Sequence, residues 1–238
     1  MANPRRHDSP NELVHVIAHS VHRDRLFPDA GWMTQFEQLF AIEAEDRSWD
    51  VWSYCLMGTH YHLLLSTPDC SLSAGLQRLH LRMSIERNRS AQRMGRLFSS
   101  RHRAISIRDN DHLAACLRYI PMNPVKAGLC AHPSEWQWGS FRAIAGYDMA
   151  PDWIGVSEVR RFLAVSTPAE LVNWVTQSKR AQPPLTERDW KRYDVERCLL
   201  DGKTREQIAG ELGISVRWVE RLASRSGLTS AGGLRETE

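Results

Sequence analysis

The stretch YCLMGTHYHLLL, residues 54–65, decides the fold, because two apolar runs flank the short turn Gly58-Thr59. A two-residue loop that begins with Gly suits a tight hairpin, since Gly accepts the positive φ that such a turn requires. Side chains alternate between the two faces of a strand, so His60 and His62 are predicted to share one face, about 7 Å apart. Two imidazoles at that spacing can share a metal ion.

Hydrophobic patterns on either side of this hairpin predict alternating strands and helices. The predicted order β-α-β-β-α-β-α is typical of an α+β fold: an antiparallel sheet with helices on one face, close to a split β-α-β or ferredoxin-like arrangement. We expect the sheet face that carries His60 and His62 to be open. The expected strands lie within 12–21, 50–57, 60–67 and 103–107, and the expected helices within 32–47, 72–88 and 110–120.

A second motif, RYIPMNPV at residues 118–125, supplies a tyrosine hydroxyl and an amide four residues later. An apolar stripe on the preceding helix should be buried, and Tyr119 lies about 200° around the helix from Leu117. This placement favours a functional Tyr119, although a structural tyrosine that closes the helix end fits the pattern equally well. Pro121 is expected to disturb the helix directly after Tyr119.

The overall composition indicates a globular chain without a membrane span. It has 238 residues, 42% of them hydrophobic, and a net charge of +3, and no apolar run reaches 18 residues. No apolar segment follows the basic N-terminus, so we expect no signal peptide. The five cysteines are scattered and unpaired in the sequence, which favours reduced thiols and a cytoplasmic location.

Arginine is concentrated after the central hairpin, with only two acidic residues between positions 71 and 110. A solvated helix face is the ordinary interpretation of a charge run, but arginine without balancing glutamate favours a nucleic-acid groove. The candidate DNA-binding residues in this block are Arg78, Arg82, Arg96, Arg101 and Arg103.

The C-terminal region has the pattern of a helix-turn-helix. A capping box at Thr204–Gln207 opens one helix, Gly213 provides a turn, and Ser215 caps a second helix. Arg217 and Arg221 are expected on its exposed recognition face, beside Trp218. A plain helical hairpin used for packing or dimer contact is the alternative.

These patterns divide the chain into five expected segments. They are a disordered N-terminus at 1–11, an α+β domain at 12–146, a helical linker at 147–185, a helix-turn-helix at 186–228 and a disordered tail at 229–238.

The quoted motifs resemble the HUH single-strand DNA transposases with one catalytic tyrosine, and most closely the REP-associated tyrosine transposases. The similarity lies in residues 54–65, GRLF at 95–98, RYIPMNPVKAGL at 118–129 and WGSFRA at 138–143, and so spans roughly 12–146. Thr59 departs from the family, which usually has Asn there, and residues 20–25 depart from its usual loop.

The resemblance implies a metal-dependent single-strand endonuclease and strand transferase that cuts hairpin-containing, REP-like DNA. It implies that Tyr119 is the nucleophile, that His60, His62 and Asn123 bind Mg²⁺ or Mn²⁺, and that a 5′-phosphotyrosine intermediate permits rejoining of strands. Expected partners are single-stranded or hairpin DNA, and duplex DNA at the helix-turn-helix, with the protein a monomer or dimer.

Two alternatives remain open at this point. A catalytically silent, domesticated regulator could bind DNA repeats without cleaving them, but the presence of all four motif residues favours an enzyme. A structural Zn²⁺ site at the two histidines fits poorly, because no Cys or further His lies at zinc-ligand spacing.

Overall fold

The computed structural model describes residues 10–21, 25–99, 102–177, 195, 198–199, 202–212 and 214–226. It divides into two compact units, residues 1–182 and 183–238. The predictions made for residues 1–9, for Arg101, for Gly213 and for 227–238 lie outside the described residues. None of the helices in the described ranges is long and apolar enough to cross a bilayer.

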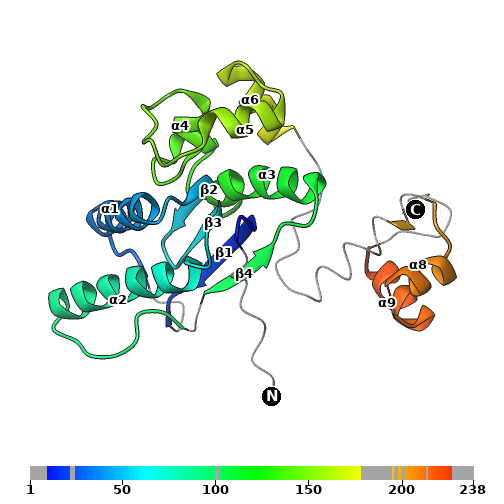
Figure 1. Ribbon diagram of the computed structural model, residues 1–238, viewed down its shortest axis with the longest axis horizontal. Coiled ribbons are helices and arrows are strands. Elements are labelled where there is room, and N and C mark those ends of the chain that lie inside the picture. The colour runs from blue at the N-terminus through cyan, green and yellow to red at the C-terminus, as the bar shows by residue number, and fades with distance from the viewer. Residues whose placement is uncertain are drawn as a thin grey trace. The chain divides into compact units, whose positions relative to one another are not determined.

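A four-stranded antiparallel sheet forms the centre of the first unit (Figure 1). Its spatial order β2-β3-β1-β4 is that of the ferredoxin-like arrangement, so the predicted α+β fold class is confirmed. The inner strands β1 and β3 are almost wholly buried, as their apolar sequences require. The strands are β1 Val14–His19, β2 Asp50–Met57, β3 His60–Ser66 and β4 Arg103–Ser106.

The β2–β3 hairpin closes at the predicted turn, with Met57 paired to His60. Gly58 does not adopt a left-handed φ, so the positive φ expected from the sequence is wrong. A Cβ built on Gly58 would meet nothing within 4 Å. Gly at this position is therefore not required by the turn or by its surroundings.

Helices cover both faces of the sheet (Figure 1). On one face, Tyr61 of β3 packs against Phe36 of α1 (Ala30–Asp46), and its hydroxyl lies 2.6 Å from His80 Nε2 of α2 (Leu72–Ser90). On the other face, α3 (Asn110–Lys126) packs against β2 and β3. The histidine face of the sheet is therefore covered rather than open, because the apolar stripe of α3 is buried upon it.

The α3 helix continues through two prolines, although the sequence suggested that it would be disturbed at the first. Pro124 has no N–H to donate to the carbonyl of Ile120 four residues earlier. The side-chain amide of Asn123 donates to that carbonyl at 3.3 Å and to the Tyr119 carbonyl at 2.9 Å. Asn123 thus replaces part of the backbone hydrogen bonding that Pro124 removes.

Short helices within and just before the predicted linker, residues 147–185, belong to the first unit. The Arg118 guanidinium lies 3.9 Å from the Trp174 ring centroid, and its Nε donates to the Trp174 carbonyl at 3.1 Å, which ties α6 to α3. The capping box at Thr167 that opens α6 is present. The helices of this region are α4 Phe141–Ala145, α5 Val156–Leu163 and α6 Pro168–Thr176, preceded by the 3₁₀ helix η2 Pro133–Glu135.

The WGS segment protects the outer edge of the sheet. Leu56 N donates to the Trp138 carbonyl at 2.8 Å, and Ser140 N donates to the Tyr54 carbonyl at 3.1 Å, so residues 138–140 pair with the edge strand β2. A Cβ on Gly139 would lie 2.9 Å from the Tyr54 carbonyl oxygen. Only glycine permits this close approach of two backbones.

In the second unit, α8 (Arg205–Leu212) and α9 (Val216–Ser226) form the predicted pair of helices. Thr204 and Gln207 form reciprocal backbone-to-side-chain hydrogen bonds, as a capping box does. Trp218, which we expected on the exposed face, packs partly against the core of this unit. That core comprises Val195, Cys198, Leu199, Ile208, Ala209, Val219, Leu222 and Ala223.

Candidate active site

Two histidines on β3 face α3 at the centre of the first unit. The ring centroids of His60 and His62 lie 5.1 Å apart. His60 is partly exposed near the hairpin end of the strand, whereas His62 is only 2% exposed. Alternation of side chains along β3 thus places both imidazoles on one face of the sheet, as predicted. Helix α3 covers that face, which was expected from the sequence to be open.

Tyr119 of α3 lies against this histidine pair. Its ring meets the His62 ring edge to face, with 5.4 Å between centroids, and the residue is 9% exposed. Asn123 lies one helical turn further on and is equally buried. The structure therefore brings together His60 and His62 of β3 with Tyr119 and Asn123 of α3. The histidines precede the two helix residues by at least 57 positions in the sequence.

Burial keeps these imidazoles neutral. It lowers the pKa of His60 to about 4, with a smaller contribution from neighbouring His19, and it lowers the pKa of His62 well below its usual range. Metal ions bind the neutral form of histidine. Both side chains are thus in the ligand form at neutral pH.

The phenol of Tyr119 is neutral at physiological pH for the same reason. Burial raises its pKa, and a hydrogen bond with the Asn123 side chain acts in the opposite direction. The Lys126 ammonium lies 4.8 Å from the centroid of the Tyr119 ring. Lys126 belongs to the same sequence motif, but the helix was expected to end near Ile120, so the sequence did not predict that Lys126 would lie against the tyrosine ring.

One atom in this site suggests a metal-binding function. The His62 Nε2 atom is buried and has no hydrogen-bond partner among the described residues. A buried polar atom without a partner is costly in a folded protein, and a coordinated cation would remove that cost. Within the described ranges no group of three His, Cys, Asp or Glu side chains could hold a metal. The ligand set that the family resemblance implies, two imidazoles and the amide oxygen of Asn123, stays a prediction.

Two further residues, for which the sequence predicted no role in the site, contact the histidine pair. The Thr59 hydroxyl lies 3.0 Å from His60 Nδ1. His15 of β1 is fully buried, and its Nε2 lies 3.0 Å from His62 Nδ1. His15 stands out in the sequence as a polar residue inside an apolar strand, but only the β1–β3 register shows which histidine it meets.

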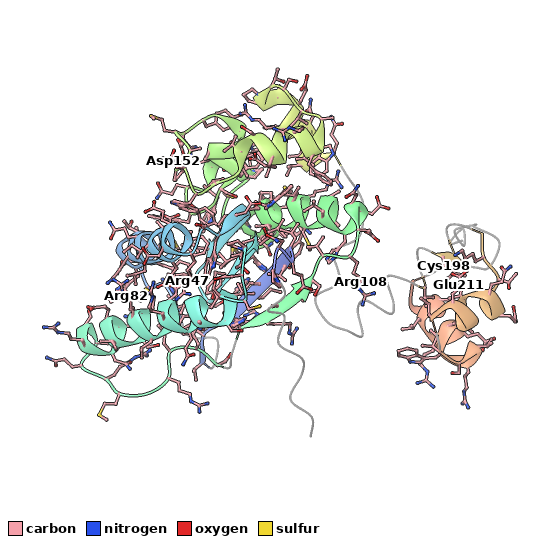
Figure 2. All side chains as sticks on the ribbon, viewed as in Figure 1. Arg47, Arg82, Arg108, Asp152, Cys198 and Glu211 are labelled. Carbon is pink, nitrogen blue, oxygen red and sulfur yellow. The ribbon has the colours of Figure 1, made fainter. Side chains whose placement is uncertain are left out.

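The predicted DNA-binding arginines differ in their surroundings. Arg78 is ion-paired with Glu43 and with Asp46, so its charge is already balanced. Arg82 on α2 (Figure 2) and Arg96 in the following loop are exposed, as is Arg103 at the start of β4. Arg101 lies outside the described residues.

In the second unit, Arg217 and Arg221 are both exposed on α9. Residues four positions apart share one face of a helix, so the two guanidinium groups lie on the same side of α9. This is the arrangement that the helix-turn-helix pattern predicted for them.

Comparison with known proteins agrees with the resemblance found in the sequence. Residues 9–123 match the family described as Transposase IS200 like. A Haemophilus influenzae protein whose name places it among the REP-associated tyrosine transposases is 24% identical over 141 residues, which cover 54% of this chain and 80% of that protein.

A solved structure shares the fold. It is a REP-associated tyrosine transposase bound to a REP hairpin, with a TM-score of 0.53 and 17% sequence identity, and the match covers 63% of this chain and 89% of that one. The resemblance to the REP-associated tyrosine transposases is therefore confirmed, and the family that matches residues 9–123 is one of transposases.

Proposed function

We propose that this chain, a relative of the IS200-like transposases through residues 9–123, cleaves and rejoins single-stranded, hairpin-containing DNA with Tyr119 as its nucleophile. The observation that carries the proposal is the packing of Tyr119 against His62, with 5.4 Å between ring centroids. A tyrosine and two neutral imidazoles at one buried point can bring a nucleophile and a cation to the same phosphate.

The Tyr119 oxygen attacks the phosphorus of a phosphodiester in this mechanism. The new bond joins the tyrosine oxygen to phosphorus, and the bond that breaks joins phosphorus to the 3′ oxygen. The phenolic proton is lost, and the 3′ oxygen leaves as a hydroxyl group. The 5′ end stays attached to the protein as a phosphotyrosine ester, so a second 3′ hydroxyl can reverse the reaction and join strands.

Four side chains support this chemistry. His60, His62 and Asn123 would hold Mg²⁺ or Mn²⁺, and the bound ion would draw off negative charge that develops on the phosphate. The uncharged ligand set would bind such hard cations weakly until a phosphate oxygen joins it. Lys126 stabilises the phenolate form of Tyr119 by its positive charge, 4.8 Å from the ring centroid.

The test is a cleavage assay with hairpin oligonucleotides from DNA that flanks the gene, labelled at both ends, in Mg²⁺ or Mn²⁺. Wild type should give a labelled protein band on a denaturing gel, and Tyr119→Phe should give none. Tyr147→Phe is the matched control, since Tyr147 is 48% exposed and should leave the band unchanged. Retarded DNA without a covalent band across all substrates would instead support the catalytically silent regulator.

Exposed arginines would hold the DNA by its phosphates. We expect Arg82→Gln and Arg96→Gln each to weaken hairpin binding by removing about one phosphate contact. In a plot of the logarithm of the binding constant against the logarithm of the salt concentration, each variant should therefore have a slope that is smaller by about 0.7–0.9. Arg78→Gln is the control, because Glu43 and Asp46 already balance that charge. An equal loss of affinity in all three variants would contradict this assignment.

The second unit would bind duplex DNA through α9. Arg217 lies on the exposed face of α9, while Val219 and Leu222 anchor the helix in the core of this unit. This division between an inner apolar face and an outer basic face is the one that a recognition helix needs. Gel retardation with duplex DNA that flanks the gene compares wild type with Arg217→Gln, and we expect the variant to bind more weakly. Equal affinity of the two proteins would indicate that α9 is a packing helix and not a recognition helix.

A further inference from the structure

Each candidate metal-binding histidine has one ring nitrogen engaged by a specific neighbour. His60 Nδ1 lies 3.0 Å from the Thr59 hydroxyl, and His62 Nδ1 lies 3.0 Å from His15 Nε2. In both imidazoles the nitrogen that remains for a ligand is therefore Nε2. At His62 this is the same atom that lacks a hydrogen-bond partner in the described structure.

The contact between His15 and His62 allows only two proton arrangements, since a neutral imidazole has one donor nitrogen and one acceptor nitrogen. In the first, His62 Nδ1–H donates to His15 Nε2, and His15 Nδ1–H points to the sulfur of Cys116 at 3.9 Å. In the second, the Cys116 thiol donates to His15, and His15 Nε2–H donates to His62 Nδ1.

The second arrangement places a proton on the buried Nε2 of His62. That N–H would have no acceptor among the described residues, and buried N–H groups without acceptors are rarer than buried acceptors without donors. It would also need the thiol, a weak donor, to set the direction of the chain. The first arrangement leaves a lone pair at Nε2, which a cation can use.

The backbone around both supporting residues is rigid. His15 lies on the inner strand β1, paired with β3 on one side and β4 on the other. The Thr59 carbonyl accepts a hydrogen bond from Ser20 N at 3.0 Å, which fixes the turn to the end of β1. The His19 ring also stacks on His60, with 4.9 Å between centroids.

We propose that Thr59 and His15 are positioning residues that hold His60 and His62 as their Nδ1–H tautomers, so that both Nε2 lone pairs are presented to one divalent cation. The proposal rests on the metal-dependent function proposed above and adds the residues that prepare the site. It also gives a role to Thr59, which stands where the related transposases usually have Asn.

Nuclear magnetic resonance on metal-free, ¹⁵N-histidine-labelled protein tests the tautomers directly. Correlations between ring nitrogens and ring protons distinguish a protonated from an unprotonated nitrogen. We expect protonated Nδ1 and unprotonated Nε2 at both His60 and His62. A protonated Nε2 at His62 in wild type would overturn the proposal, and this measurement requires neither a variant nor activity.

Metal affinity tests the positioning role. Co²⁺ binds nitrogen and oxygen ligands more tightly than Mn²⁺, so calorimetric titration with Co²⁺ is the assay. Loss of a hydrogen bond behind a metal-ligating histidine typically weakens metal binding 10- to 100-fold. We expect about that loss in Thr59→Val and in His15→Phe, and recovery in Thr59→Ser and His15→Gln, which restore a hydroxyl and an acceptor.

The outcomes separate this proposal from the proposed function. Unchanged Co²⁺ affinity in Thr59→Val and His15→Phe, with thermal unfolding like wild type, would refute the positioning role. If the expected tautomers and affinity losses are found while wild type forms no covalent DNA adduct, the positioning role stands and the tyrosine transposase mechanism fails.

Discussion

His80 of α2 should make the fold sensitive to acid. Its ring stacks on Phe98 with 3.8 Å between centroids, and its Nε2 lies 2.6 Å from the Tyr61 hydroxyl. Burial lowers the pKa of His80 from 6.5 to about 3, with a smaller contribution from His102. An unfolded chain takes up this proton near pH 6.5, whereas the folded protein stays neutral at His80 until about pH 3.

The unfolded state therefore binds more protons between these two pH values. The contribution of His80 to stability is fully present above pH 6.5 and is lost as the pH falls toward 3. Each pH unit inside that window changes the free energy of unfolding by about 1.4 kcal/mol. Between pH 6.5 and pH 5.0, His80 alone should account for a loss of about 2 kcal/mol.

Urea unfolding at pH 7.5 and pH 5.0 measures this loss in wild type and in His80→Gln. The glutamine amide can still hydrogen-bond to Tyr61 but does not titrate. We expect wild type to lose about 2 kcal/mol more than the variant between the two pH values, because the other titrating groups contribute equally to both proteins. The same loss in both proteins would refute the claim that the folded protein keeps His80 neutral.

Three further predictions concern single side chains. Gly75→Ala should lower the free energy of unfolding by about 1–3 kcal/mol, although alanine favours helices, because its Cβ would overlap Trp49 Cζ2. Chemical unfolding measures this change, and Gly58→Ala is the near-neutral control. Asn123→Ala should lower the free energy of unfolding by about 1 kcal/mol in the same assay, because the Ile120 carbonyl loses its donor; an unchanged value would refute this. Lys126→Met should slow formation of the covalent protein–DNA adduct about three- to fivefold in a time course, because it removes a cation–π contact with Tyr119 that is worth about 0.5–1 kcal/mol. Lys126→Arg keeps the positive charge and should not slow the reaction.

The sheet and its hairpin could be predicted because their signals are local. Strand β2 has the predicted bounds, and β3 starts at His60 as expected. Alternation of side chains then placed His60 and His62 on one face without any knowledge of the fold. The helix-turn-helix was accessible for the same reason, since the capping box at Thr204 and the apolar positions of both helices lie within about 20 residues.

Other features depended on contacts that the sequence does not show. The continuation of α3 requires the Asn123 side chain to supply a donor that Pro124 lacks, and a rule about proline alone does not include such compensation. Coverage of the histidine face depended on which face of the sheet the apolar stripe of α3 packs against, and the sequence does not show this. The role of Arg78 was hidden because its partners Glu43 and Asp46 come from another helix.

His15 shows the same limit within the site itself. It lies 47 positions before His62, and only the strand register brings the two rings to 3.0 Å. The apolar pattern around His15 predicts a buried strand but indicates no role for the histidine. A polar residue inside an apolar strand was the available signal, and pairing β1 with β3 would have been needed to interpret it.

The most direct test of the central claim is to identify the residue that becomes attached to DNA. Wild-type protein would be incubated with hairpin oligonucleotide and Mn²⁺, digested with nuclease and trypsin, and analysed by mass spectrometry. The account predicts a nucleotide adduct on the peptide that contains Tyr119, and its absence in Tyr119→Phe. An adduct on another residue such as Tyr147, or cleavage that persists in Tyr119→Phe, would contradict it.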